Sequence, residues 1–269
     1  MAHGQLDLFS ARAPLREPDP RPGEIVRCVD ASALSDDVLV AAIPHASIAE
    51  SRLLAAEAAR RRIAAAIPAL ENLCHRLTGY GRDCLVPEQV AALEALSALG
   101  GAAAVQAVVR ILTRGAVQGP TLVVAAEAAA HLKANLLPHI ALVLLRNPDP
   151  LVRANGCRCA RPHPATLPVL VDLLEDLHER VRIAAACALG RVGRLEAPPL
   201  LTRLLREAPS AEVIEATPAI ADEECCVLLG RIARNRSALS SAALDALNSI
   251  DDPRAERIIA GLVGTARDR

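Results

Sequence analysis

A short internal repeat is the feature that most restricts how this sequence can fold. Val123, Val152 and Val181 recur every 29 residues, and each opens an alanine-rich segment with helical periodicity. Each segment is followed by a proline placed where a second helix would begin, and these prolines are Pro138, Pro168 and Pro199. Proline suits the first helical position because its missing N–H would have no intrahelical partner there. One such helix pair cannot bury its apolar face alone, so the repeat predicts stacked pairs.

The composition favours a core that is only two helices thick. Aromatic residues make up 1% of the chain, with Phe9 and Tyr80 as the two examples, and tryptophan is absent. A single wide core normally uses aromatic rings, because each ring buries a large area. No segment alternates apolar and polar residues, so we expect no β-strand. The sequence therefore predicts an all-α fold, a right-handed α-solenoid of about five or six helix pairs.

Three parts are expected along the chain. Residues 1–24 alternate proline with charged residues and should form an extended, solvated tail. Residues 25–86 should form a helical cap, and residues 87–269 the solenoid, with less regular units over 211–234 and 240–263. Gly100 and Gly190 lie where first helices should end, and we expect both to take the left-handed cap conformation.

Charge and hydropathy argue for a soluble protein of the cytoplasm. The formal net charge is −1, so no general attraction to nucleic acid or to an anionic membrane is expected. The most apolar run, 136–145, is interrupted by Pro138 and His139 and is too short to span a bilayer. In the cytoplasm, the eight cysteines should remain reduced thiols.

Two segments resemble a known repeat family. Asp149–Arg153 and Glu179–Gly190 are similar to the short HEAT repeats of the phycobilin-lyase type, and the resemblance covers about residues 87–265. It implies a HEAT-like solenoid. Because this repeat class serves lyase subunits, hydroxylases and plain adaptors, the resemblance implies little about activity.

One group of cysteines invites a reading as a metal site. Cys157, Cys159 and His163 lie close in sequence, with Cys187 one repeat later. Two cysteines separated by one residue on a helix point about 200° apart, so one helix cannot direct both thiols at one ion. Cysteine also packs as a small apolar residue. We therefore expect core packing, and we assign no metal and no cofactor.

Two further patterns bear on a possible enzyme site or nucleic-acid site. HEAT-like hydroxylases hold two iron ions with repeated His-Glu pairs, whereas only His178-Glu179 occurs here, which predicts no catalytic residues and no enzyme activity. HEAT-like DNA glycosylases need aromatic surfaces for base stacking, and Tyr80 is the one aromatic residue of the folded part. Arg60–Arg62 could contact phosphates, although a charged helix end is usually a solvated face, so DNA remains the weaker partner.

Charged residues also recur at the repeat spacing. Arg153 and Arg182 occupy equivalent positions, and Asp172 and Arg203 align one unit apart. Such ladders could line a ligand groove. Opposite charges on adjacent repeats more often form structural ion pairs, and that is the reading we favour.

The clearest functional motif lies in the tail. Gln5, Leu6, Asp7, Leu8 and Phe9 resemble, at every position, the pentapeptide with which bacterial DNA-maintenance proteins bind the β sliding clamp. The resemblance implies clamp binding, with docking on the chain's own solenoid or on another partner as the alternative.

The sequence therefore predicts an adaptor that docks on the clamp through its tail and presents the solenoid to a second, unidentified protein. Two alternatives remain open. One is a lyase-like or hydroxylase-like HEAT enzyme subunit, and the other is a regulatory or immunity protein unrelated to the clamp.

Overall fold

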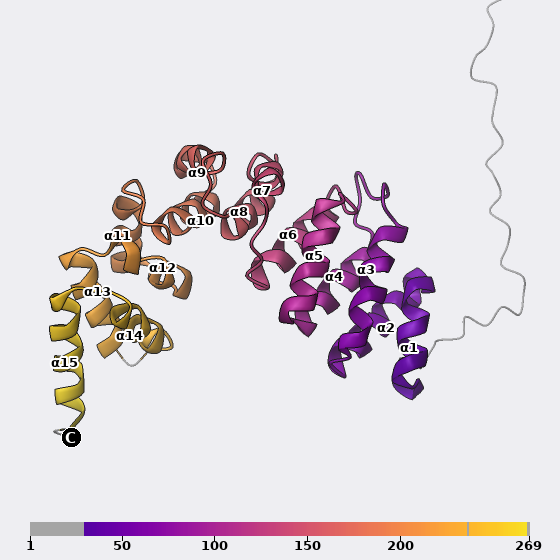
Figure 1. Ribbon diagram of the computed structural model, residues 1–269, viewed down its shortest axis with the longest axis horizontal. Helices are drawn as coiled ribbons and strands as arrows, with labels where there is room; N and C mark the ends of the chain where they lie inside the picture. The colour runs from indigo at the N-terminus through magenta and orange to yellow at the C-terminus, as the bar shows by residue number, and fades with distance from the viewer. Residues whose placement is uncertain (1–29, 236, 268–269) are drawn as a thin grey trace, which may run out of the picture.

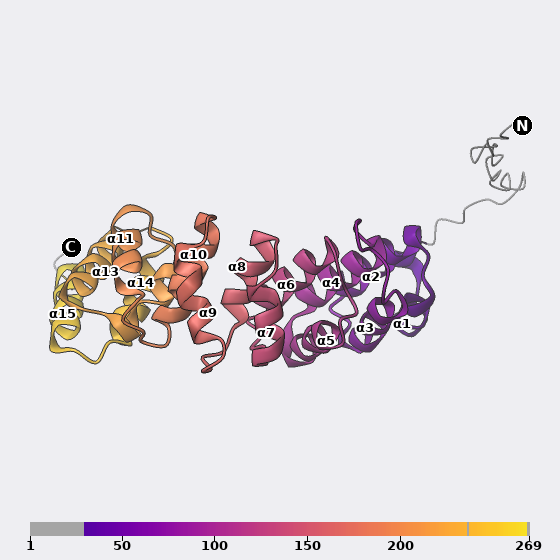
Figure 2. The same cartoon turned by 90° about the horizontal axis from the view of Figure 1, so that it is seen from above.

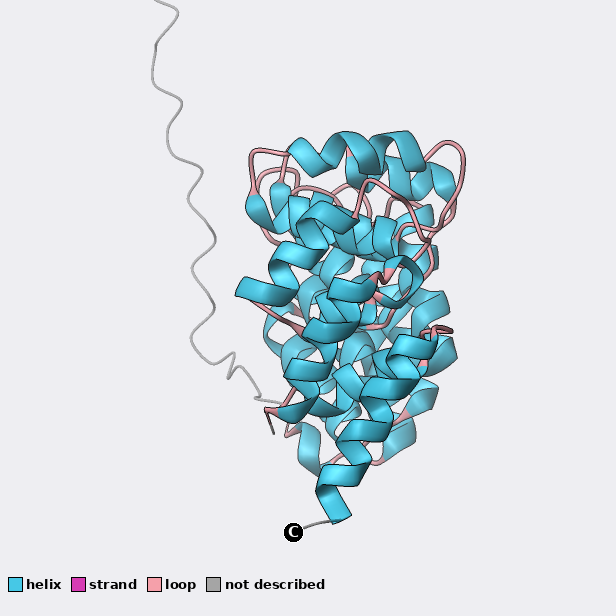
Figure 3. Cartoon of the chain, turned by 90° about the vertical axis from the view of Figure 1, so that its left-hand side faces the viewer, coloured by secondary structure: helices cyan, strands magenta, loops and turns pink. Residues whose placement is uncertain are grey.

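The described residues, 30–235 and 237–267 of the computed structural model, form a row of α-helices bent into an arch (Figure 1). They contain no β-strand, and the one β-bridge is an isolated pair between Leu136 and Ala160. An end-on view shows helices joined by short loops throughout this part of the chain (Figure 3). The expectation of an all-α solenoid is confirmed.

The helices alternate between two layers. The even-numbered layer holds α2 (Ile48–Arg60), α4 (Pro87–Leu99), α6 (Thr121–His131), α8 (Pro150–Cys159), α10 (Glu179–Gly190), α12 (Ala211–Glu215) and α14 (Ser240–Asn248). The odd-numbered layer holds α1 (Asp36–Ala42), α3 (Ile67–Arg76), α5 (Gly101–Thr113), α7 (Pro138–Leu145), α9 (Leu167–Asp172), α11 (Pro198–Glu207), α13 (Glu223–Arg234) and α15 (Pro253–Arg267).

Each helix of the even-numbered layer from α2 to α14 packs against the next helix of that layer. Figure 2 shows the two layers running in parallel from α2 to α9. From α4 to α15 the described chain makes six consecutive helix pairs, in agreement with the predicted number. Where the arch bends, α7 and α9 lie on its outer side, while α8, α10 and α12 lie towards its inside (Figure 1).

The repeat landmarks occupy equivalent structural positions. Val123, Val152 and Val181 are each the third residue of a helix. Val152 and Val181 are almost fully buried. Pro138 is the first residue of α7, and α9 and α11 also carry proline within their first two residues. Sequence periodicity therefore located both helices of the central units.

The apolar core runs along the whole row and consists mainly of alanine and leucine with smaller numbers of valine, isoleucine and cysteine. Two clusters of buried residues meet at α8, which contributes to both. Val152 and Cys159 belong to the N-terminal cluster, whereas Ala154 and Cys157 belong to the C-terminal one. Because opposite faces of α8 serve the two clusters, this helix joins the halves of the solenoid.

One of the two predicted glycine caps is wrong. Gly100 ends α4 with a positive φ of 66°, a backbone region that favours glycine, although its ψ of −166° differs from that of a left-handed helix. Gly190, however, is the buried last residue of α10, and the left-handed conformation belongs to Gly193, with φ of 71°. A Cβ at position 190 would lie 2.5 Å from Leu201 Cδ1 and 2.6 Å from the carbonyl oxygen of Ala216. Glycine at 190 therefore serves close helix packing.

Candidate partner-binding groove

Four linked pockets follow the even-numbered layer from α4 to α14, and together we call them the groove. The first, of about 440 Å³, lies between α4 and α6 and shares Glu127 with the second, of about 350 Å³, between α6, α8 and α10. The second shares Arg158 with a third of about 360 Å³. The third shares Lys133 and Glu215 with a fourth, of about 320 Å³, between α12 and α14. These shared side chains make the pockets one continuous surface.

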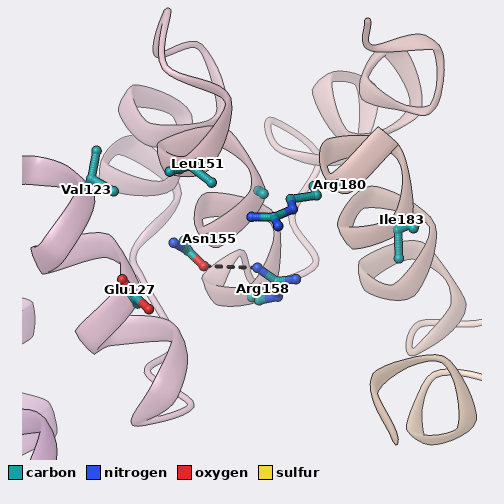
Figure 4. Close-up of a pocket in the computed structure, with 8 residues that line it drawn as sticks. Val123, Glu127, Leu151, Asn155, Arg158, Arg180 and Ile183 are labelled. Carbon is teal, nitrogen blue, oxygen red and sulfur yellow. Dashed lines mark hydrogen bonds between the residues drawn. The ribbon is translucent and has the colours of Figure 1, made fainter. Parts of the chain in front are cut away.

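The second pocket, here called the central pocket, combines apolar and charged side chains from three successive units (Figure 4). Its lining comprises Val123 and Glu127 of α6, Leu151, Ala154, Asn155 and Arg158 of α8, and Arg180 and Ile183 of α10. Pockets that combine an apolar wall with a few polar groups are typical of binding sites.

A fixed hydrogen-bond network holds Arg158 in the central pocket. Its Nη1 donates to Asn155 Oδ1 at 3.0 Å, while Nε and Nη2 donate to the two carboxylate oxygens of Glu212 at 2.9 and 3.0 Å. Burial works against the charge of Arg158, but the hydrogen bond and charge of Glu212 outweigh it, so the pKa of Arg158 lies above its usual value. This bidentate pair orients the guanidinium, with three of its five N–H groups engaged.

Arg180 and Glu127 face the same pocket from different helices. Arg180 extends from α10 towards α8, and Glu127 lies on α6 at the opposite side (Figure 4). Both side chains are exposed, and neither side chain forms a hydrogen bond or an ion pair within the described residues. The central pocket therefore presents one unpaired charge of each sign, available to a bound molecule.

The arginine ladder predicted from the repeat is structural. Arg153 makes a bidentate ion pair with Asp176, which lies in the loop before α10, with N–O distances of 2.8 and 3.0 Å. Arg153 also donates a hydrogen bond to the carbonyl oxygen of Asn147 in the loop before its own helix. Arg182 likewise donates to the carbonyl oxygens of Asp176 and Leu177 in its own preceding turn. Both arginines therefore fix the turns between units and lie outside the lining of the groove.

The second predicted ladder does not form. Arg203 approaches Glu207 of its own helix at 4.0 Å, and among the described residues it has no ion pair with Asp172. The alignment of these two residues in the repeat therefore does not bring their side chains together.

The cysteines weighed as metal ligands pack in the core. Cys157, Cys159 and Cys187 are each at most 1% exposed, and burial raises the pKa of all three thiols to about 12. His163 is exposed and accepts a hydrogen bond from the backbone of Ala165. Within 30–235 and 237–267, no group of three or more His, Cys, Asp or Glu side chains is arranged to hold a metal ion.

The arginine run after α2 is largely engaged within the protein. Arg60 and Arg61 both donate to Glu57, at 2.6 to 2.8 Å. Arg61 also donates to the carbonyl of Leu34 at 2.8 Å and to Asp36 at 2.9 Å. Arg61 therefore holds α2 and the segment around α1 together, while Arg60 is paired within α2, and these contacts reduce the availability of both groups to phosphates.

The charged and polar residues of the groove were not identified from the sequence. Arg180 occupies the repeat position of Leu151, and Asn155 occupies that of Ala184, so the charged and polar groups do not recur from unit to unit. Repeat analysis emphasises recurring residues, which here are structural. Arg180 could have been found from the sequence because it is an arginine at a repeat position where the preceding unit has leucine.

The other predicted site falls outside the structure. Gln5, Leu6, Asp7, Leu8 and Phe9 lie outside the described residues. None of the helices that are described has both the length and the apolar character that a membrane crossing requires.

Comparison with known proteins agrees with the stacked helix pairs. A family model for HEAT repeats matches residues 137–221, a span that runs from the start of α7 to just after α12 and contains most of the central pocket. No curated protein matches the chain. The HEAT repeats favour a general role in protein interaction or as a scaffold. The matched span and the solenoid around it support a HEAT-like repeat protein.

Proposed function

We propose that this protein is a non-enzymatic adaptor of the bacterial cytoplasm, with a partner protein bound in the groove and the β sliding clamp bound by Gln5–Phe9. The observation that carries the proposal is the groove itself, which links successive units and presents unpaired charges. A surface built from several repeats suits an extended protein segment better than one small molecule, because its length is set by the number of units.

The central pocket supports recognition of a protein segment. Its apolar side chains offer area for burial, and the Asn155 amide and the Arg158 guanidinium are held by their mutual hydrogen bond. Groups held in place before binding lose little conformational freedom when a partner is bound. The polar groups of the groove are therefore suited to orient a segment whose apolar residues supply most of the affinity.

The tail supports the second half of the proposal through its resemblance to clamp-binding peptides. In such peptides the glutamine makes polar contacts in a small pocket, and the last leucine and phenylalanine fill an apolar cleft. Carried over, Gln5 would orient the peptide, Leu8 and Phe9 would be the anchors, and Asp7 would lie at the rim. Leu6 would support the extended conformation.

Fluorescence polarisation of a labelled peptide covering residues 1–15 against a bacterial sliding clamp tests the tail. We expect a dissociation constant in the micromolar range, which corresponds to a binding free energy of about −8 kcal/mol. The affinity is modest because the short peptide loses conformational freedom when it binds. Leu8→Ala combined with Phe9→Ala should abolish binding, because the two anchors supply most of the buried area. The rim substitution Asp7→Ala is the matched control and should change affinity little. Equal binding of the wild-type and doubly substituted peptides, or no binding by either, would refute clamp docking.

A further inference from the structure

We propose that the groove selects a partner segment of defined charge order, with basic residues at the end that lies over α4 and α6 and acidic residues at the end that lies over α10. The inference rests on the proposed function of the groove and specifies the chemistry of its partner. It is carried by the arrangement of the unpaired charges along the solenoid.

The acidic end of the groove lies between α4 and α6. Glu94 and Glu127 line this pocket, and neither carboxylate has an ion pair among the described residues. Val124 and Ala98 supply apolar surface beside them. An exposed carboxylate on an apolar surface attracts a lysine or arginine whose aliphatic stem packs on that surface.

The basic end lies on α8 and α10. Arg180 near the start of α10 and Arg191 at its end both line the groove, and neither has an ion-pair partner in the described chain. Arg158 adds two N–H groups beyond the three that its network uses. Guanidinium groups in this arrangement suit a carboxylate, which can accept two parallel hydrogen bonds from one arginine.

Beyond α10 the groove charges of α12 are paired, whereas Asp245 of α14 lines the fourth pocket without an ion pair among the described residues. Lys133 and Glu215 form an ion pair of 2.8 Å, and Glu212 pairs with Arg158. From α4 to α10, the unpaired acidic and basic groups therefore lie on opposite sides of α8, and the exposed Leu151 of α8 supplies apolar surface between them. A segment placed in the reverse direction would bring like charges together, which disfavours it.

Selection of random displayed peptides on the full-length protein tests this charge order. We expect enriched peptides to contain an apolar stretch with basic residues at one end of it and acidic residues at the other end. A synthetic enriched peptide and a second one with the same composition but exchanged charges are then compared by fluorescence polarisation. The exchanged peptide should bind about fivefold more weakly or worse, because favourable contacts become repulsive.

Groove variants locate the binding. Arg180→Glu should weaken the enriched peptide about fivefold or more, whereas Arg146→Glu, the same charge change at the end of α7 outside the groove lining, should have little effect. Glu127→Arg combined with Arg180→Glu should reverse the preference and favour the exchanged peptide. This reversal cannot arise from simple loss of folding.

Two other results would overturn the inference in distinguishable ways. If peptides bind more weakly to the Leu151→Asp variant but equally well to the Arg180→Glu variant, the groove is a binding site but does not select a charge order. Peptides unaffected by either substitution, or the absence of any enriched peptide, would overturn both this inference and the proposed role of the groove.

Discussion

Gln89 shows how one polar side chain can hold several elements of a thin core together. It is fully buried in α4, and its amide nitrogen donates to the carbonyl oxygens of Cys74 at 3.0 Å and Ala116 at 2.9 Å. A third carbonyl, of Leu77, lies at 3.3 Å. The carbonyls of Cys74 and Leu77 also accept backbone N–H groups, whereas for Ala116 the Gln89 side chain is the donor, so Gln89 ties the end of α3 to the segment after α5.

Replacement of Gln89 should therefore be costly. Gln89→Ala leaves the carbonyl of Ala116 without its donor, removes one of the two donors to the carbonyl of Cys74 and opens a cavity, so we expect a loss of about 2–3 kcal/mol in the free energy of unfolding. Gln106→Ala, on the exposed side of α5, is the matched control and should change stability by less than about 0.5 kcal/mol. Urea unfolding followed by circular dichroism measures both. Equal midpoints for the two variants would contradict this role of Gln89.

At the scale of elements, the close approach of α10 to its neighbours makes a clear prediction. In an open helix, alanine is more stable than glycine by up to about 1 kcal/mol. At Gly190 the added methyl would collide with Leu201 and Ala216, so Gly190→Ala should lower the thermal midpoint. Gly261→Ala in α15 has no heavy atom within 4 Å of the new methyl and should keep or raise it. A higher midpoint for Gly190→Ala would show that α10 does not pack as described.

Attachment of α1 to α2 should depend on pH through Glu57. Hydrogen bonds from Arg60 and then Arg61 lower the pKa of Glu57 from 4.5 to about 2. A lowered pKa in the folded state means that the stabilisation is present above pH 4.5 and is lost as the pH falls towards 2. The stability difference between wild type and Glu57→Gln should therefore shrink over this window, as measured by urea unfolding at a series of pH values. A stability difference between the two proteins that stayed constant from pH 4.5 to pH 2 would contradict the lowered pKa of Glu57.

The elements also show what sequence could and could not establish. Val152, Val181 and Pro138 located helices because their roles depend on local periodicity and on the chemistry of helix starts. Gly190 was misread because its role depends on contact with Leu201 of the following helix, and no local rule reports that distance. Arg180 was missed for the related reason that its exposure in the groove results from the stacking of three units.

At the scale of the whole molecule, ion pairs between units that are not adjacent along the chain shape the groove. The ion pair between Lys133 and Glu215 joins residues 82 positions apart and connects the turn after α6 to α12. Arg158 and Glu212 make a second such connection from α8. These pairs lie along the groove, so the spacing of its walls is tied to the stacking of the units rather than to any single helix.

An adaptor requires that its two binding surfaces act independently. The tail motif at Gln5–Phe9 lies outside the described residues, whereas Arg180 lies in the groove, and the two are far apart in the sequence. Substitutions that leave the helices folded should therefore remove one partner without removing the other.

Quantitative affinity capture from bacterial extract, with the intact chain and two variants as baits, tests this independence most directly. We predict that Leu8→Ala with Phe9→Ala loses the sliding clamp and keeps a second protein, and that Arg180→Glu loses the second protein and keeps the clamp, with unchanged circular dichroism for all three baits. If the captured proteins are the same for all three baits, or if neither partner is captured by the intact chain, the protein is not the adaptor described.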